Sequence, residues 1–414
     1  MDLLRFFTAG NVDDGKSTLI GRLLYDSESI STDIIETLTR QSKTAGEHAA
    51  IDLALLTDGL RAEREQGITI DVAYKYFSTE KRKFIIADTP GHAQYTRNMF
   101  TGASTAQLAI ILVDARNGIT DQTKRHSIIS ATLGIPQVLV CINKMDLVDY
   151  SEERFDEIVS DYSDFARLIG LKNVDYIPTS ALVGENVVHK GELLGWYPGP
   201  SLLHYLENIE LETQEASEEA RFQVQLVIRP QTDALHDYRG YAGSVLNGTF
   251  RTGDEVLVLP SGWSSKISRI ERNLKEVASA GKNEPVIFHL EDDLDISRGN
   301  TIVPVHSLPQ SGKSLEATIC WMDNAAFNPG QKFLLQQNSF RTKAAIKEIH
   351  TKIDIHSFGN LESDGTLRLN ELAKVSIKTA EAVSYDAFGK LPKTGAFILI
   401  NEHTNQTAAA GVIG

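Results

Sequence analysis

The sequence has little cysteine, no long apolar run and no excess of basic charge. Only two cysteines, Cys141 and Cys320, occur in 414 residues, and no Cys/His spacing is typical of a zinc site. Cys141 lies in the apolar run 138–142, so we expect a buried, reduced thiol. No segment has the length of a membrane span or the pattern of a secretory signal. We therefore expect a cytoplasmic protein with no membrane partner.

The charge balance bears on possible partners. The formal net charge is −14, and an acidic surface repels a nucleic-acid backbone unless basic residues are segregated in a patch. We therefore expect no nucleic-acid partner. With 42% hydrophobic and 23% charged residues, the chain has the composition of a globular protein, and its length suggests two or three domains.

The organisation of the chain changes near residue 211. Before it, short apolar runs alternate with helical patterns, which predicts an α/β domain whose mostly parallel sheet is covered on both faces. The expected strands there are 3–9, 84–87, 108–113, 138–142 and 176–178, and the expected helices are 18–25, 123–133 and 152–168.

A polar, acidic stretch at 212–220 is followed by short alternating runs punctuated by glycine, a texture typical of antiparallel barrels. A second boundary is expected at the Pro/Gly/Ser-rich segment 308–314. The sequence therefore predicts an α/β domain at 1–211 and two antiparallel β-barrel domains at 220–309 and 313–414. The expected barrel strands are 222–228, 242–246, 254–259, 266–270, 315–322, 343–350, 371–379 and 397–400.

A phosphate-binding loop follows the first expected strand. The match to G-x-x-x-x-G-K-[ST] consists of Gly10, Asn11, Val12, Asp13, Asp14, Gly15, Lys16 and Ser17, with Thr18 next in the helix. Glycine lets the backbone N–H groups approach phosphate oxygens, Lys16 adds charge at the β- and γ-phosphates, and the Ser17 hydroxyl can ligate Mg²⁺. Chance is the alternative, and the order of strand, loop and helix argues against it. Asp13 and Asp14 are unfavourable near phosphates unless they point away or meet a cation.

A second G-K-S sequence occurs at 312–314. The first glycine of the motif would have to stand at position 307, which is Ser307, and no apolar strand directly precedes it. We interpret this segment as an inter-domain turn and not as a second nucleotide site.

The next motif would select the base. It comprises Asn143, Lys144, Met145 and Asp146. It follows the run 138–142, at the strand edge where open α/β sheets bind ligands. The Asp146 carboxylate can accept from N1–H and N2–H₂ of guanine, whereas adenine would leave it unpaired. Lys144 can lie over the ring, and Ser180 and Ala181 can offer a backbone N–H to the guanine O6. The alternative for this motif alone is a helix-start cap.

Two further motifs lie between the phosphate loop and Asn143. The first comprises Asp88, Thr89, Pro90, Gly91 and His92. Asp88 can hold Mg²⁺ through water, the Gly91 N–H can reach the γ-phosphate, and His92 would stand beside the attacking water, although a D-x-P-G turn is the alternative. The second motif, at 67–70, offers the Thr69 hydroxyl to Mg²⁺ while a γ-phosphate is present. That motif is weak by itself, and the charged stretch 61–66 before it could equally be a solvated helix face.

Together these residues resemble the translation-factor class of GTPases, such as elongation factor Tu, from residue 7 to residue 181. The two expected β domains fit the same three-domain plan. The resemblance implies catalytic roles for Lys16, Gly91 and His92, and Mg²⁺ ligation by Ser17, Thr69 and Asp88. It implies guanine recognition by Asn143, Lys144, Asp146, Ser180 and Ala181.

A more detailed resemblance is to the large GTPase subunit of bacterial sulfate adenylyltransferase. The similar segments are 10–18, 62–74, 76–79, 91–99, 143–150, 238–243 and 295–299. Translation factors usually place His where this chain has Asp14. Ala93 and Asn300 depart from the family, which more often has Glu and Asp there, but neither departure removes an expected ligand.

The resemblance implies a GTPase subunit that uses GTP and Mg²⁺. Its hydrolysis of GTP would drive a small catalytic subunit, in a heterodimer or a higher assembly, to make adenylyl sulfate and diphosphate from ATP and sulfate. The alternatives are a stand-alone nucleotide hydrolase and a translation factor that delivers aminoacyl-tRNA. The acidic charge and Asp14 count against the translation factor, and the segments 238–243 and 295–299 favour sulfate activation.

Overall fold

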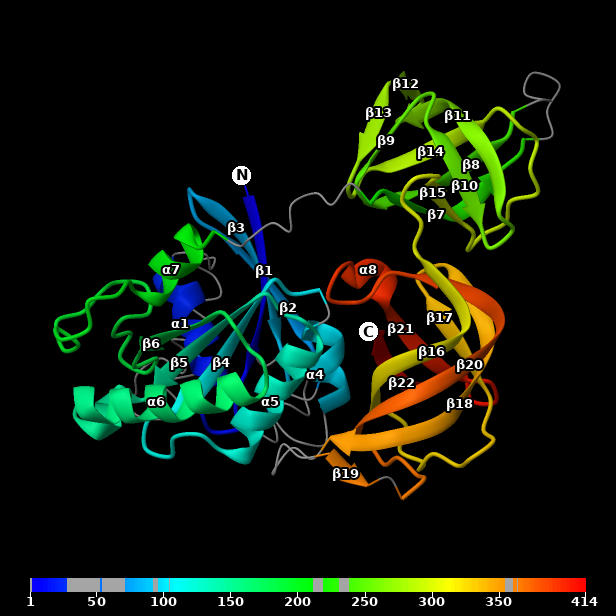
Figure 1. The fold of residues 1–414 in the computed structure, drawn as a ribbon. Coiled ribbons are helices and arrows are strands. Elements are labelled where there is room, and N and C mark those ends of the chain that lie inside the picture. The colour runs from blue at the N-terminus through cyan, green and yellow to red at the C-terminus, as the bar shows by residue number, and fades with distance from the viewer. Residues whose placement is uncertain are drawn as a thin grey trace. The chain divides into compact units, whose positions relative to one another are not determined.

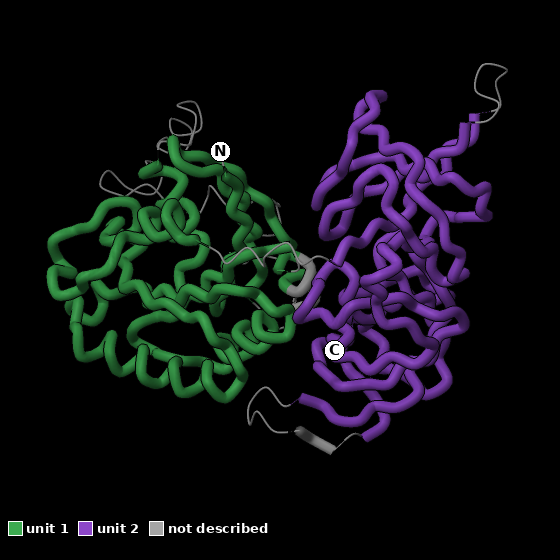
Figure 2. The backbone as a smooth tube through the Cα atoms, turned by 45° about the horizontal axis from the view of Figure 1, so that its top comes forward, with its two compact units in different colours: residues 1–211, 354–359 green, residues 212–353, 360–414 purple. Residues whose placement is uncertain are grey.

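The computed structural model describes residues 2–27, 53, 71–91, 96–103, 105–210, 219–230, 238–353, 360–362 and 364–414. The chain divides into two compact units, residues 1–211 with 354–359 and residues 212–353 with 360–414 (Figure 2). The first unit holds a mixed, mostly parallel sheet with helices, and the second holds two closed antiparallel barrels. The predicted fold class is therefore confirmed. The predicted domain boundaries stay predictions, because both barrels fall in one compact unit.

The sheet of the first unit has the strand order β2-β3-β1-β4-β5-β6, with β2 antiparallel to β3 and the other neighbours parallel. Its strands are β1 (Asp2–Ala9), β2 (Ala73–Ser78), β3 (Arg82–Asp88), β4 (Leu108–Asp114), β5 (Gln137–Asn143) and β6 (Val174–Pro178). Its helices are α1 (Lys16–Asp26), α4 (Thr96–Ala103), α5 (Asp121–Thr132), α6 (Glu152–Leu168) and α7 (Leu202–Asn208), with a short 3-10 helix at Met145–Val148.

Helices cover both faces of this sheet. Helices α1 and α7 share one apolar core with Leu4 and Phe6 of β1, and α4, α5 and α6 lie on the opposite face (Figure 1). The central strand β4 is buried along its whole length, as expected of a parallel strand covered on both sides. Because β1, β3, β4, β5 and β6 run in parallel, their carboxyl ends meet at one edge. That edge carries the candidate site.

The predicted helices at 18–25, 123–133 and 152–168 are α1, α5 and α6, each with its ends within two residues of the prediction. Helix α6 begins after Ser151, whose hydroxyl accepts from the N–H of Arg154. The edge strand β2 was not predicted, and neither were α4 and α7. The sequence of β2 has Lys75 between Tyr74 and Tyr76, so it contains no continuous apolar run. Both tyrosines are exposed.

The second unit contains two barrels, each closed by six strands. The first closes through β10-β15-β7-β8-β14-β11, and the second through β17-β21-β22-β16-β20-β18. The first has β7 (Arg221–Ile228), β8 (Gly240–Asn247), β9 (Thr249–Arg251), β10 (Glu255–Leu259), β11 (Trp263–Arg272), β12 (Lys275–Val277), β13 (Ser279–Gly281), β14 (Pro285–Leu290) and β15 (Thr301–Pro304). The second has β16 (Gln310–Trp321), β17 (Phe333–Gln337), β18 (Phe340–Ile353), β19 (Asn360–Glu362), β20 (Leu372–Tyr385), α8 (Pro392–Gly395), β21 (Ala396–Asn401) and β22 (Thr407–Ile413).

A buried ion pair joins the two barrels within this unit. The Arg221 guanidinium binds both carboxylate oxygens of Asp386, at 3.0 and 2.8 Å, and also donates to the carbonyl oxygens of Ala220 and Ser307. The Thr394 hydroxyl donates to the same carboxylate at 2.8 Å. All of these contacts lie inside the unit, so we expect the pair to have a structural role.

The prediction of a turn at 312–314 is wrong. These residues lie in β16, which pairs with β20 from Gln310 onward and shifts its register between Gly312 and Ser314. Pairing with a long neighbouring strand overrides the local turn preference of Gly and Ser. Among the described residues, no helix is long and apolar enough to cross a membrane.

Candidate functional site

The phosphate loop connects β1 to α1 in a conformation that requires glycine. Gly15 has a φ of +87°, in the left-handed region, and a Cβ there would stand 2.6 Å from Asn143 Nδ2. At Gly10 a Cβ would stand 3.0 Å from the Leu112 Cβ. Gly15 is also the residue before α1 and has no side chain to cap the helix. The first N–H groups of α1 can therefore face an anion.

Lys16 and Asp88 face each other below this loop. Lys16 Nζ lies 3.6 Å from Asp88 Oδ1, and both side chains are almost fully buried. The Thr8 hydroxyl donates to the same Asp88 oxygen at 3.3 Å, and the Thr89 hydroxyl donates to the Thr8 carbonyl at 2.7 Å. Two neighbouring strands, β1 and β3, thus fix the carboxylate at their common edge.

Gly91 lies directly against the phosphate loop. A Cβ at Gly91 would stand 2.4 Å from the carbonyl oxygen of Gly10, so only glycine fits there. Gln122, at the start of α5, donates from Nε2 to the Gly91 carbonyl oxygen at 2.7 Å. Gln122 is not predicted from the sequence, because nothing local to 120–124 reveals a partner that lies 31 residues away.

Asn143 connects three predicted parts of the site. Its Nδ2 donates to the Asp14 carbonyl oxygen at 2.8 Å. Its Oδ1 accepts from the Ala181 N–H at 2.9 Å and from the Thr179 hydroxyl at 3.3 Å. The phosphate loop, the end of β5 and the segment after β6 are therefore held together by one buried amide.

Lys144 is held over the phosphate loop by Asp114. Its backbone is left-handed, with a φ of 63°, and its Nζ lies 3.0 Å from Asp114 Oδ2 and also donates to the Asp13 carbonyl. Arg116 binds both oxygens of Asp114, at 3.0 and 2.6 Å. Burial favours a higher pKa for Asp114, but hydrogen bonds from Arg116 and Lys144 outweigh it and hold this pKa at about 2.

Asp114 and Arg116 are functional candidates that the sequence analysis missed. Asp114 ends the buried strand β4 and stands directly beside Asn143 in the sheet register. The sequence does contain a signal for Asp114. This charged residue ends the apolar run 108–113, and the strand predicted there neighbours the one that leads to Asn143 at the ligand-binding edge.

Asp146 is oriented by Ser180, which lies in the segment after β6. The Ser180 hydroxyl donates to Asp146 Oδ1. Met145, between Lys144 and Asp146, is buried, and its N–H donates to the Thr179 carbonyl oxygen at 3.2 Å. One oxygen of the Asp146 carboxylate is therefore held by Ser180, so two of the residues predicted to recognise guanine lie in contact.

Asp14 turns its side chain into the protein. It is only 2% exposed, and its Oδ2 accepts from the N–H of Asn11 at 2.6 Å. Burial raises its pKa to about 6, against the opposing effect of the Asn11 hydrogen bond and with a further increase from Asp114. The unfavourable charge noted in the sequence is thus directed away from the loop surface.

The structure brings together all the predicted phosphate-loop and base-motif residues. Val12 and Asp13 are exposed, Ser17 and Thr18 are half-buried, and Thr89, Pro90 and Ser180 are buried. Two predicted residues, Thr69 and His92, lie outside the described residues. All the assigned roles stay predictions.

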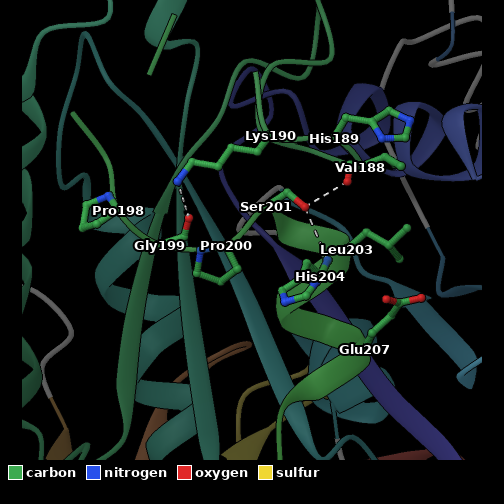
Figure 3. Close-up of a pocket in the computed structure, with 10 residues that line it drawn as sticks. All are labelled: Val188, His189, Lys190, Pro198, Gly199, Pro200, Ser201, Leu203, His204 and Glu207. Carbon is green, nitrogen blue, oxygen red and sulfur yellow. Dashed lines mark hydrogen bonds between the residues drawn. The ribbon is translucent and has the colours of Figure 1, made fainter. Parts of the chain in front are cut away.

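The first unit also has a pocket of about 550 Å³ between segment 188–190, segment 198–201 and helix α7 (Figure 3). Lys190 Nζ donates to the Gly199 carbonyl at 3.1 Å, and the Ser201 hydroxyl donates to the Val188 carbonyl at 2.9 Å. The predicted site residues are absent from the described lining of this pocket. The pocket and the candidate site are therefore made by different residues.

Two family models match the chain. The family described as Elongation factor Tu GTP binding domain matches residues 1–227, which is more than half of the chain. The family described as GTP-eEF1A C-terminal domain-like matches residues 314–414. The first match includes every residue predicted to hold the nucleotide.

Curated relatives match along almost the whole chain. Sulfate adenylyltransferase subunit 1 of Bacteroides thetaiotaomicron is 49% identical and covers 100% of this chain and 86% of that protein. The protein of the same name from Colwellia psychrerythraea is 48% identical, with 100% and 88% covered. The Bifunctional enzyme CysN/CysC of Mycobacterium tuberculosis is 48% identical, with 99% of this chain and 67% of the relative covered. The similarity therefore extends over both compact units.

Proposed function

This chain belongs to the sulfate adenylyltransferase subunit 1 family and, over residues 1–227, to the elongation factor Tu type of GTP-binding domain, and on this premise we propose its function. It binds and hydrolyses GTP, and this hydrolysis drives a separate catalytic subunit to form adenylyl sulfate and diphosphate from ATP and sulfate. The observation that supports this best is the Asn143 amide, which joins the phosphate loop to the base motif and to Ala181.

The phosphate loop binds the triphosphate through its backbone. The glycine positions allow close approach, the N–H groups at the start of α1 face the phosphates, and Lys16 supplies a full positive charge. The buried position of Lys16 strengthens its attraction, because little water screens it.

The base motif selects guanine over adenine. Asp146 accepts from N1–H and N2–H₂ of guanine, and the Ser180 hydroxyl holds its carboxylate in place for that contact. Lys144 covers one face of the base while Asp114 and the Asp13 carbonyl fix its ammonium group. The preference follows because adenine would leave the Asp146 carboxylate unpaired.

The donor set fits Mg²⁺. The Ser17 hydroxyl and the Asp88 carboxylate are hard oxygen donors, and Asp88 is buried and oriented by the Thr8 hydroxyl. Ser17 and Asp88 would hold the ion, with Thr69 as a further predicted ligand. An ion held by these residues would supply positive charge that offsets the negative charge developing on the transferred phosphoryl group.

The segment after β3 responds to the γ-phosphate. The Gly91 N–H binds a γ-phosphate oxygen, while Gln122 holds the carbonyl group of the same residue. His92 positions the attacking water, since a loose phosphoryl-transfer transition state needs little help from a base. Reordering of these segments on hydrolysis changes the contact with the catalytic subunit.

The translation-factor alternative is the weaker candidate. Two relatives that match the full chain, from Bacteroides thetaiotaomicron and Colwellia psychrerythraea, carry the name of a sulfate adenylyltransferase subunit. The acidic net charge of −14 also disfavours binding of tRNA.

The test is a reconstituted assay. The purified chain is mixed with its small catalytic subunit, ATP, sulfate and Mg²⁺, and adenylyl sulfate is measured with and without GTP. GTP is expected to increase the yield with the wild-type chain and with Lys190→Met, which removes a lysine of the pocket beside helix α7. The increase is expected to vanish with Lys16→Met. No GTP-dependent increase with the wild-type chain contradicts the proposal, and binding of charged tRNA would favour the alternative.

A further inference from the structure

Asp14 is a buried carboxylate inside a loop that is built to hold a polyanion. Its side chain is 2% exposed, whereas the neighbouring Asp13 is exposed to solvent. Buried carboxylates are rare unless they are paired with a cation or hydrogen-bonded. The position of Asp14 therefore calls for a physical explanation beyond the phosphate contacts of the loop.

The carboxylate acts as a brace within the loop. Asp14 Oδ2 accepts from the N–H of Asn11 at 2.6 Å, and the Asp14 N–H in turn donates to the Asn11 carbonyl at 3.2 Å. The Asp14 carbonyl oxygen is held from outside the loop by Asn143 Nδ2 at 2.8 Å. These contacts set the curvature of residues 11–14. Asp14 thus positions the N–H groups that follow it, and it does so through the backbone.

The charges around Asp14 do not neutralise it fully. Asp114, at the end of β4, and Asp13, in the same loop, repel its negative charge, and Lys144, after β5, attracts it. Lys144 is shared, because its ammonium group also contacts Asp114 and the Asp13 carbonyl. Arg116, the other cation of this cluster, is bound to both oxygens of Asp114. A polyanion bound to the loop adds more negative charge beside Asp14.

We propose that Asp14 binds a proton when the loop binds GTP, so that the nucleotide and the proton enter the site together. The proton comes from water and goes to Oδ1, the carboxyl oxygen that does not accept from Asn11. No other bond forms or breaks, and Oδ2 keeps its hydrogen bond to the Asn11 N–H. This inference rests on the proposed GTP binding and adds the role of Asp14 as a positioning residue.

The ionisation of the free chain fits this proposal. Burial, opposed by the Asn11 hydrogen bond and reinforced by Asp114, raises the pKa of Asp14 to about 6. The carboxyl group is therefore mostly charged near neutral pH and needs only a modest further rise of its pKa to take up a proton. A further rise of about one unit makes GTP binding about tenfold weaker well above this pKa than below it.

The variant Asp14→Asn removes the negative charge of the side chain but can keep its hydrogen bond with the Asn11 N–H. The amide has the shape of the carboxyl group and an oxygen that can accept from Asn11, but it carries no charge. GTP binding is measured by calorimetry between about pH 5.5 and about pH 8, in buffers that differ in their heat of ionisation, which counts the protons taken up. Asp156→Asn removes an exposed aspartate of α6 and is the matched control for a change of net charge.

The wild-type chain and Asp156→Asn are expected to take up protons with GTP and to bind it about three- to tenfold more tightly at the acid end of this range. Asp14→Asn is expected to bind at alkaline pH as tightly as the wild type binds at acid pH, and to lose the proton uptake due to this residue. Groups that titrate elsewhere, including the γ-phosphate, cancel in this comparison. Asp14→Ala removes both charge and brace, so its binding is expected to be weaker than that of Asp14→Asn at every pH.

If the wild type and Asp14→Asn show equal proton uptake and equal pH profiles, the proposal that Asp14 binds a proton is overturned. Equal affinities of Asp14→Ala and Asp14→Asn would overturn the positioning role. Failure of the wild-type chain to bind GTP at any pH would overturn the proposed function, and this inference with it. The two levels of the proposal therefore fail by different results.

Discussion

The two compact units each contain a buried ion pair, and the two pairs are built differently. In the second unit, Arg221 binds both oxygens of Asp386 at 2.8 and 3.0 Å. Its Nη1 donates to the carbonyl oxygens of Ala220 and Ser307. In the first unit, Lys16 Nζ lies 3.6 Å from Asp88 Oδ1. Both pairs are almost fully buried.

The difference is the one expected between a structural pair and a pair that exchanges its partner for a ligand, which is the role predicted for Lys16. The planar guanidinium of Arg221 is matched to one carboxylate in a fixed geometry, which suits a permanent joint between barrels. A lysine ammonium is a point charge on a flexible stem and can turn from Asp88 to a phosphate without a rearrangement of the backbone. The two pairs are equally buried, so burial does not distinguish them, and the prediction that Lys16 binds phosphate rests on the longer geometry of its pair and on its place in the phosphate loop.

The largest effect on stability is expected from Arg221→Met. It leaves the Asp386 carboxylate buried without its cation and should lower the free energy of unfolding by about 3–5 kcal/mol. Urea denaturation followed by circular dichroism measures this loss. The double variant Arg221→Met with Asp386→Leu should recover much of it. A loss below about 1 kcal/mol for the single variant would show that the joint is not structural.

Lys16→Met should act on turnover more than on stability. It removes the charge that we propose meets the β- and γ-phosphates, so GTP hydrolysis should fall by about 100- to 1,000-fold. The free energy of unfolding should fall less than in Arg221→Met, because the Lys16 pair is longer. Release of inorganic phosphate measures the first effect. Unchanged turnover, or a loss of stability as large as that of Arg221→Met, would remove the distinction between the pairs.

Asn143→Ala tests the amide that joins the three segments of the first unit. It leaves the Asp14 carbonyl and the Ala181 N–H without their partner. The losses in the free energy of GTP binding and in the free energy of unfolding should add up to about 2–3 kcal/mol. Asn186→Ala is the matched control. Asn186 is equally buried and donates to the Pro178 carbonyl at 2.9 Å, outside the predicted site. Calorimetric GTP affinities should fall in the first variant and change little in the second.

A smaller effect than that of Asn143→Ala is expected from Asp114→Asn. The amide holds Lys144 less firmly, so the GTP affinity should fall by about tenfold or less, which is about 1.4 kcal/mol. Arg116→Ala removes the other partner of Asp114 and leaves Lys144 in place, so its effect should be smaller still. A larger loss in Arg116→Ala would mean that Arg116, and not Lys144, needs the Asp114 carboxylate.

The sequence predicted the fold class and the main site motifs because both depend on local patterns. The phosphate loop and Asn143 to Asp146 stand at strand ends that apolar runs make visible. Strand β2 was not predicted, because its tyrosines are exposed at the edge of the sheet and do not form an apolar run. The turn at 312–314 was wrong because pairing between β16 and β20, which no local pattern reveals, decides the conformation there.

The missed site residues share one property. Asp114, Gln122 and Thr8 act through partners that lie far away in the sequence. Asp14 was noticed for its charge, but its brace to Asn11 and its burial emerge only from the folded loop. Register and burial, which set these contacts, are tertiary properties.

The central claim is that GTP held by Asp146 drives sulfate activation by a partner. Xanthine has a carbonyl group where guanine has its N2 amine, so an asparagine at 146 can donate to xanthine where the aspartate accepts from guanine. The decisive measurement is therefore adenylyl sulfate formed by the complex that contains Asp146→Asn, supplied with either GTP or xanthosine triphosphate. The account predicts that xanthosine triphosphate drives the reaction and GTP no longer does. Undiminished stimulation by GTP in this variant would contradict it.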